Sequence, residues 1–150
     1  MLKCWGAEVL KCAGSAIAVS PSMGVKAFVD LAAWQRADEL RRFVMEITAR
    51  PYVARDVRFC EQCKSAARSV PNNIAEGFGR YHHREFAQFV RMALGSLQEL
   101  RDQMHDAHER GYISDAEFLA AETTIRRAVA SCAGLERYLR ATKAPPSRST

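Results

Sequence analysis

The 150-residue sequence has no apolar stretch long enough to cross a membrane, which takes about 18 or more consecutive apolar residues. It also has no disulfide framework, because its five cysteines are an odd number without regular spacing, which favours reduced thiols. Glu8 and Lys11 interrupt the one stretch that resembles the apolar part of a signal peptide. These absences predict a soluble, cytoplasmic protein without a membrane span.

The local motifs of the common enzyme classes are also missing. The sequence contains no phosphate-binding P-loop, no G-x-S-x-G nucleophile motif, no H-E-x-x-H zinc motif and no dinucleotide-binding glycine pattern. Paired Glu-x-x-His motifs, which hold two metal ions in some helical bundles, are absent as well. We therefore expect a protein that is not an enzyme and that uses no cofactor and no metal.

Two residue pairs have spacings that also occur in metal sites. Cys60 and Cys63 form a C-x-x-C, but no second pair accompanies it, so we interpret both as small core residues. His105 and His108 are one helical turn apart and could share a metal, yet acidic residues surround them, which is typical of a solvated face. A metalloenzyme is kept as a third hypothesis, after the two binding roles below.

The net charge of +5 lies mostly outside the central region, since residues 30–142 carry only +1. Within that region the charge is polarised: residues 50–91 carry +4, residues 92–125 carry −5 and residues 126–140 carry +3. Nearly all of these cations are arginines, which suit bidentate contacts with phosphate or carboxylate groups. The distribution, more than the total, indicates a basic surface and favours head-to-tail contacts between copies of the chain.

Four segments have apolar residues spaced alternately three and four positions apart, the pattern of a helix with one buried face. They cover residues 30–48, 53–79, 82–110 and 114–142. The third has the clearest pattern, formed by Phe86, Val90, Ala93, Leu97, Leu100, Met104 and Ala107. No strand pattern competes, so the sequence predicts an all-α protein with an antiparallel up-and-down four-helix bundle.

Local signals mark where these helices begin and end. Asp30 is the expected N-cap of the first helix, and Pro51 ends it because the residue before a proline is pushed out of the α region. Gly111 is the expected C′ residue of the third helix. Ser114, with Glu117 three residues later, predicts a capping box at the start of the fourth.

The interiors of the second and third helices hold residues that disfavour a regular helix. Pro71 removes one backbone hydrogen bond and predicts a kink near residues 68–72 or a break. Gly77 and Gly79 are expected to end the second helix. In the third helix, Gly95 and the following Ser96 form a small pair that would allow another backbone to approach closely.

Two ordered motifs in these helices resemble those of a known family. The first is close to S-I-P-x-N-I-A-E-G, with valine at position 70 in place of isoleucine, and is filled by Ser69, Pro71, Asn73, Ile74, Ala75, Glu76 and Gly77. The second is close to A-x-G-S-L-x-E-L and is filled by Ala93, Gly95, Ser96, Leu97, Glu99 and Leu100. Over residues 28–142 the chain resembles the four-helix-bundle proteins encoded in intervening sequences of bacterial 23S ribosomal RNA genes.

The resemblance implies a four-helix bundle that assembles as a homopentamer, in which the second helix continues through Pro71 with a distortion. Asn72 and Asn73 would then satisfy backbone groups freed there. The family includes the accessory variability determinant of diversity-generating retroelements, a pentamer that binds a reverse transcriptase and nucleic acid. Next to the motifs we expect a surface of arginines that contacts an anionic partner. The alternative is that these arginines are ordinary solvated side chains. Its candidate residues are Arg68, Arg80, Arg84 and Arg91.

The sequence thus predicts a poorly ordered N-terminal extension at residues 1–27, a bundle at residues 28–142 and a disordered tail at residues 143–150. The first functional hypothesis is an accessory or scaffold protein that binds nucleic acid, RNA in particular, through its basic surface. The second is a protein-binding accessory subunit, for example of a retroelement reverse transcriptase, without direct nucleic-acid contact. Neither hypothesis involves a membrane.

Overall fold

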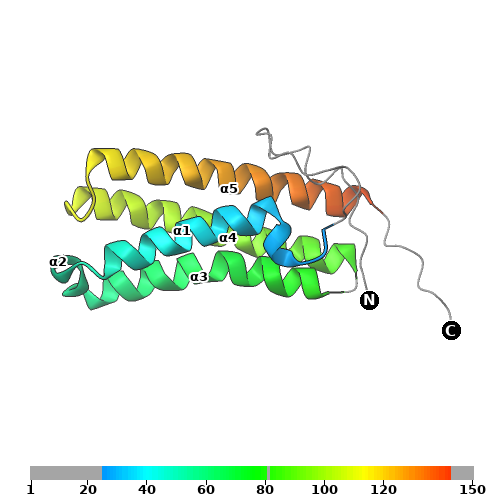
Figure 1. Ribbon diagram of the computed structural model, residues 1–150, viewed down its shortest axis with the longest axis horizontal. Coiled ribbons are helices and arrows are strands. Elements are labelled where there is room, and N and C mark those ends of the chain that lie inside the picture. The colour runs from blue at the N-terminus through cyan, green and yellow to red at the C-terminus, as the bar shows by residue number, and fades with distance from the viewer. Residues whose placement is uncertain (1–24, 81, 143–150) are drawn as a thin grey trace.

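The computed structural model describes residues 25–80 and 82–142, which contain helices and no strand. A 3-10 turn, η2 (Phe28–Asp30), precedes α1 (Ala32–Thr48), α2 (Pro51–Ala54), α3 (Val57–Gly79), α4 (His83–Glu109) and α5 (Asp115–Ala141). The four long helices lie side by side, and α2 is a single turn at the end where α4 leads into α5 (Figure 1). The all-helical prediction is confirmed. Of the predicted poorly ordered extension at residues 1–27, residues 1–24 lie outside the described residues, and Val25 is buried against the core; the predicted tail at residues 143–150 also lies outside the described residues.

The core forms where each long helix packs against two others, in the cyclic order α1, α3, α4 and α5. The apolar stripes expected from the sequence are buried there almost completely, and on α4 every member of the stripe is at most 3 % exposed. Val57 is an exception, since 62 % of it is exposed. No helix in the described ranges is long and apolar enough to span a bilayer.

The start of α1 differs from the expected one. Its N-cap is Leu31, which has no capping side chain, and Leu31 is itself buried in the core. Asp30 belongs to η2, where its carboxylate accepts a hydrogen bond of 3.0 Å from the backbone N–H of Ala27. The prediction of Asp30 as the N-cap of α1 is therefore wrong. The N-cap position is held by Leu31, whose side chain packs in the core and so positions the start of the helix.

The second predicted helix begins later than expected. Residues 51–54 form the separate turn α2, and α3 starts at Val57 with Asp56 as its N-cap. The Asp56 carboxylate accepts the Phe59 N–H at 3.1 Å, which is the usual way an aspartate satisfies a free donor of the first turn. Residues 55 and 56 separate α2 from α3. Because Val53 of α2 also packs in the core, the apolar spacing runs across this interruption, and the sequence pattern did not reveal it.

The proline and glycines of α3 do not interrupt it, since the helix continues through Pro71 and Gly77 to Gly79. The predicted compensation by Asn72 and Asn73 is wrong: the carbonyl that loses its usual N–H partner at Pro71 is that of Ala67, whereas Asn73 donates its side-chain amide to the Ser69 carbonyl at 2.8 Å, and Asn72 makes no side-chain hydrogen bond within the described residues. The helix ends at Gly79, as predicted, but the prediction that Gly77 also ends it is wrong, because Gly77 is a buried residue inside the helix.

The later boundaries follow the sequence closely. Gly111 has a φ of 71°, the left-handed conformation that glycine adopts most readily after a helix. The Ser114 hydroxyl accepts the Glu117 N–H at 3.2 Å, while the Glu117 carboxylate accepts the Ser114 N–H at 2.8 Å. The predicted capping box of α5 is confirmed.

Candidate functional site

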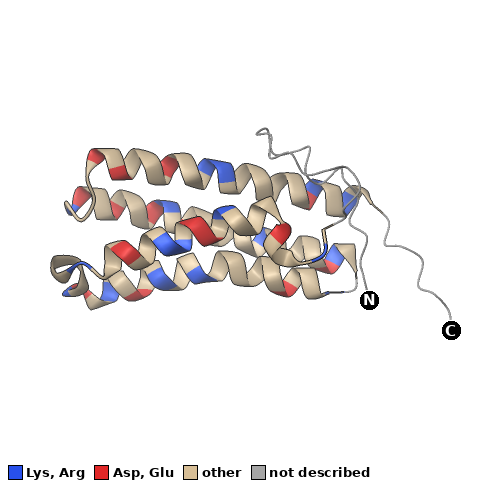
Figure 2. Ribbon diagram, viewed as in Figure 1, with Lys and Arg blue, Asp and Glu red and all other residues tan. Residues whose placement is uncertain are grey.

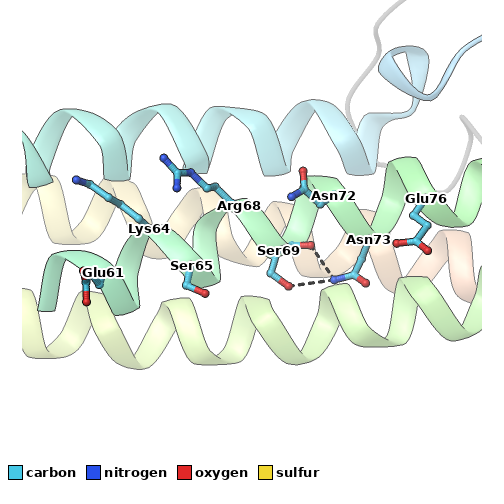
Figure 3. A pocket seen from close by; sticks show the side chains of 8 residues that line it. All are labelled: Glu61, Lys64, Ser65, Arg68, Ser69, Asn72, Asn73 and Glu76. Atoms are coloured by element: carbon cyan, nitrogen blue, oxygen red, sulfur yellow. Dashed lines mark hydrogen bonds between the residues drawn. The ribbon is translucent and has the colours of Figure 1, made fainter. Parts of the chain in front are cut away.

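The two sequence motifs meet at the outer seam between α3 and α4. The Ser69 and Ser96 hydroxyl oxygens are 2.8 Å apart, and the Asn73 amide donates to the Ser69 hydroxyl at 3.0 Å (Figure 3 shows the contacts of Asn73). Further along the seam, the Cys63 Sγ is 3.7 Å from the Gln103 Oε1. Residue numbers therefore increase along α3 in the direction in which they decrease along α4.

Gly77 gives the motif a packing role. A Cβ atom placed on Gly77 would lie 2.4 Å from the Cδ2 of Phe86 and 2.8 Å from the Cβ of Phe89. Such distances are far below van der Waals contact, so the aromatic residues of α4 occupy the space that a side chain at position 77 would need. Pro71, also of the motif, is buried in the same helix.

Of the remaining motif residues, Ile74, Ala93, Leu97 and Leu100 are buried in the core, whereas Glu76, Gly95 and Glu99 lie on the surface. Glu76 is exposed and pairs with Arg80 at 2.6 Å. Glu99 is also exposed and has no ion pair within the described residues. Gly95 is exposed too, and a Cβ built on it would meet nothing within 4 Å. No neighbour therefore comes close at Gly95, and the contact at Ser96 joins two side-chain hydroxyls, those of Ser96 and Ser69.

The four arginines predicted to contact an anion are all exposed but do not form one group. Arg84 and Arg91 are two turns apart on α4 and share a face, whereas Arg68 and Arg80 on α3 point about 120° apart. Arg80 is held by Glu76, and its guanidinium lies 4.9 Å from the centre of the Phe89 ring. The other three have no ion pair in the part of the chain that the structure describes.

A shallow hollow of about 500 Å³ lies on the outer face of α3 (Figure 3). Lys64 and Arg68 supply its positive charge, and serine and asparagine side chains supply neutral hydrogen-bonding groups. It is lined by Glu61, Lys64, Ser65, Arg68, Ser69, Asn72, Asn73 and Glu76. Lys64 was not among the predicted site residues, although it precedes Arg68 by four positions, the spacing that places two side chains on one helical face.

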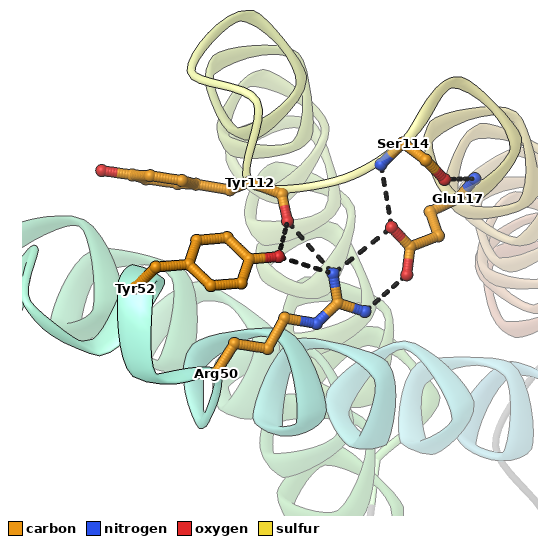
Figure 4. Close-up of polar contacts among 5 residues, drawn as sticks. All are labelled: Arg50, Tyr52, Tyr112, Ser114 and Glu117. Atoms are coloured by element: carbon orange, nitrogen blue, oxygen red, sulfur yellow. Dashed lines mark hydrogen bonds and ion pairs between the residues drawn. The ribbon is translucent and has the colours of Figure 1, made fainter.

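A polar network at the α2 end joins parts of the chain that are distant in sequence (Figure 4). The Arg50 guanidinium contacts the Glu117 carboxylate at 2.5 Å and donates to the Tyr112 carbonyl at 3.1 Å. The Tyr52 hydroxyl donates to the same carbonyl at 3.3 Å. This network was also missed, because its partners become neighbours only when the helices pack.

The charge polarity is visible along the helices (Figure 2). Acidic residues lie along the first half of α5, and arginines follow them. Several cations are neutralised by specific carboxylates: Arg101 by Glu122 at 2.8 Å, for example, and Arg110 by Asp56 at 2.8 Å. Unlike these, Arg126, Arg127 and Arg137 on α5 have no ion pair among the described residues.

The Cys60–Cys63 and His105–His108 pairs lie in surroundings that favour a structural role over metal binding. Burial raises the pKa of the Cys63 thiol to about 12, so this thiol stays protonated and unreactive at neutral pH. His108 lies 2.6 Å from Asp115, and the Phe118 ring stacks on it with ring centres 4.7 Å apart. Among the described residues, no group of three His, Cys, Asp or Glu side chains is arranged to hold a metal ion.

A sequence model of the family described as 23S rRNA-intervening sequence protein matches residues 29–133. The matched region begins within η2 and ends at residue 133 of α5, so it covers both motifs, all of α1, α3 and α4, and most of α5. No curated protein matches the chain.

Proposed function

Because the chain belongs to the family of 23S rRNA-intervening sequence proteins, we propose that it is a non-enzymatic, oligomeric scaffold or accessory protein that binds RNA through a basic surface. One observation carries this proposal. On α3, α4 and α5, the half-buried Lys64 and several exposed arginines have no ion pair within the described residues: Arg58, Arg68, Arg84, Arg91, Arg126, Arg127 and Arg137. Such cations remain available to phosphate groups, whereas paired ones are already compensated.

The RNA-binding role predicts an affinity that falls steeply with salt, because counterions are released when cations meet phosphates. In filter binding to a structured RNA, we expect the wild-type affinity to fall at least about tenfold between 50 and 200 mM salt. The variant Arg68→Glu with Arg84→Glu and Arg91→Glu should bind more weakly and with a smaller salt slope. A control, Arg36→Glu with Arg42→Glu and Arg140→Glu, changes the net charge equally at cations that carboxylates already hold. Absence of salt-sensitive binding by the wild type would exclude direct RNA binding.

We further propose that the protomer is an antiparallel up-and-down four-helix bundle and that five copies form a ring. The reversed order of the contacts between α3 and α4 supports the antiparallel arrangement. The basic and acidic segments of one protomer could meet those of its neighbours in a head-to-tail ring. Exposed Met92 on α4 and Leu119 on α5, at 50 % and 65 %, offer apolar contacts for such an assembly.

Light scattering tests the assembly directly. A pentamer has a mass of about 84 kDa, five times the 16.8 kDa of one chain. We expect this mass to persist at micromolar concentration, and replacement of Met92 by aspartate to lower it, because a buried unpaired charge would weaken an apolar contact. A mass of one chain at micromolar concentration would contradict the ring.

A protein-binding role without nucleic-acid contact is the second candidate, for example as an accessory subunit of a retroelement reverse transcriptase. The same exposed Met92 and Leu119 favour it, because single apolar side chains on helical faces can anchor a partner protein. The neighbourhood of the gene separates the two roles: a reverse transcriptase gene with a repeat pair favours this candidate, and a position inside a ribosomal RNA gene favours the first.

A further inference from the structure

The cations that begin at the end of α2 and continue along α3 are not paired with carboxylates in the described residues. Arg55, Arg58, Lys64 and Arg68 fall within fourteen residues of chain, and none of them has an ion pair among the described residues. Asp56, between the first two, is occupied: its carboxylate accepts the Phe59 N–H, the Tyr112 hydroxyl and the Arg110 guanidinium. Glu61 is the one other acid in this stretch. The stretch therefore presents a net positive surface.

The exposed side chains of α3 form a continuous stripe, which we call the α3 stripe. Its members are spaced three and four positions apart, which places them on one face of the helix. The α3 stripe consists of Arg58, Glu61, Ser65, Arg68 and Asn72, all exposed. Lys64 lies beside it, and the head groups of Lys64 and Arg68 extend to the same side of the helix in Figure 3. The distance from Arg58 to Arg68 along the axis is about 15 Å at 1.5 Å per residue.

The hollow on α3 adds uncharged hydrogen-bonding groups to the stripe. Ser65 and Asn72 line it and are exposed, and neither side chain makes a hydrogen bond within the described residues. Phosphate oxygens accept hydrogen bonds from such hydroxyl and amide groups, as well as from arginine and lysine. The hollow thus combines two cations with free neutral donors within two helical turns. Of the two carboxylates in its lining, Glu76 is paired with Arg80, and Glu61 has no ion pair within the described residues.

At the α2 end an aromatic ring is exposed. Tyr52 is 52 % exposed, and its hydroxyl is anchored to the Tyr112 carbonyl, which orients the ring. The Tyr52 and Tyr112 rings are 6.5 Å apart, and the Tyr112 and Phe59 rings are 5.1 Å apart. The aromatic residues therefore extend from the exposed Tyr52 ring to Phe59, the residue that follows Arg58 of the α3 stripe.

We propose that the α3 stripe, with Lys64 and Tyr52, binds a single-stranded nucleic acid. Arg58, Lys64 and Arg68 contact phosphates of one strand, and the Tyr52 ring stacks on one unpaired base. An exposed ring can reach bases only where they are unpaired, since duplex bases are stacked inside the helix. At about 3.4 Å per nucleotide, a 15 Å stripe matches four to five nucleotides. The inference rests on the proposed RNA-binding function and assigns it to one surface.

The charge part is tested by fluorescence anisotropy with labelled 12-nucleotide single strands of RNA and DNA and with a matched duplex. The full-length wild type should bind the single strands more tightly than the duplex. The variant Arg58→Gln with Lys64→Gln and Arg68→Gln should lose about 30-fold in affinity for the single strand at 100 mM salt, and its salt slope should fall by about two. The control Arg36→Gln with Arg42→Gln and Arg140→Gln removes as many positive charges at cations that carboxylates already hold, and it should lose less than about threefold.

The stacking part is tested separately. Tyr52→Ala should weaken binding about 5- to 100-fold, whereas Tyr52→Phe, which keeps the ring, should stay close to the wild type. With an abasic strand of the same length, Tyr52→Ala and the wild type should bind equally, which a purely structural effect of the substitution would not produce.

Three results would overturn the assignment: equal losses in the α3 variant and its control, tighter binding of the duplex, or unchanged binding by Tyr52→Ala. In each of these the wild type still binds nucleic acid, so the proposed function survives. If the wild type binds neither the strands nor structured RNA even at 50 mM salt, the function itself fails together with the assignment. Circular dichroism of each variant establishes that the helices are intact.

Discussion

Replacement of Gly77 by alanine is expected to lower the free energy of unfolding by about 1–3 kcal/mol, the usual cost of overpacking a core. The added Cβ would lie 2.4 Å from the Phe86 ring and 2.8 Å from the Phe89 Cβ. Phe86 is 1 % exposed and packed on every side, so its ring cannot move away without displacing other core residues. Alanine also gains about 1 kcal/mol of helix propensity over glycine, and we expect the steric cost to exceed this gain.

Gly79 provides the matched control two residues later in α3. A Cβ at this position meets nothing within 4 Å. Gly79→Ala should therefore leave stability unchanged or raise it by up to about 1 kcal/mol. Urea denaturation of both variants at one protein concentration measures the difference, because assembly would make the apparent stability depend on concentration. Equal midpoints for Gly77→Ala and the wild type would show that α3 and α4 are not packed as closely as described.

Replacement of Glu117 by glutamine is expected to cost about 1–2 kcal/mol at neutral pH. The Arg50 guanidinium, and secondly the Ser114 backbone N–H, lower the pKa of Glu117 from 4.5 to about 2. A fully realised shift of this size would be worth about 3 kcal/mol, and the 32 % exposure of the carboxylate reduces it. Glutamine can still accept the Ser114 N–H in the capping box, so the variant isolates the ion pair with Arg50.

The pH dependence of this contribution has a definite sign. A carboxylate whose pKa is lowered by folding binds fewer protons in the native state than in the unfolded state. The contribution of Glu117 is therefore complete above about pH 4.5 and is lost as the pH falls towards about 2. In that window the wild type should lose stability faster than Glu117→Gln, and the two curves should converge near pH 2.

Thermal unfolding at several pH values measures this convergence. Glu99→Gln is the control, because Glu99 is exposed and has no ion pair within the described residues. It should follow the wild-type curve at every pH. A constant offset between Glu117→Gln and the wild type down to pH 2 would show that the loss comes from the shape of the side chain and not from its charge.

The helices themselves were predictable because their signals are local. The stripe from Phe86 to Ala107 required a helix of that length, and the structure buries all of its members. Gly111 and the Ser114 capping box mark the α4–α5 turn through contacts within a few residues. The start of α3 was missed because Val53 and Val57 continue the apolar spacing, although the helix is interrupted at residues 55 and 56 and only Val53 is buried.

The candidate site was predictable only in part. Arg68 was found because it lies beside the motif, and the structure leaves it exposed and without an ion pair among the described residues. Arg80 also lies beside the motif, but Glu76 holds it, and their spacing of four residues on one helix is a local signal for this pair. Lys64 and Tyr52 were missed because neither belongs to a motif. Whether a ring is exposed, and whether a cation meets a carboxylate of another segment as Arg50 meets Glu117, depends on how the helices pack.

By itself the sequence determined that the chain is helical, where its long helices lie and which face of each is buried, because periodicity, capping and glycine conformation act over a few residues. The tertiary structure alone decided that Gly77 is a packing position and not a helix end, since this follows from the approach of Phe86 across the α3–α4 seam. It also decided that Arg50, Tyr112 and Glu117 form one network although more than sixty residues separate Arg50 from its partners. Contacts between distant segments depend on the geometry of helix packing, and no local pattern encodes them.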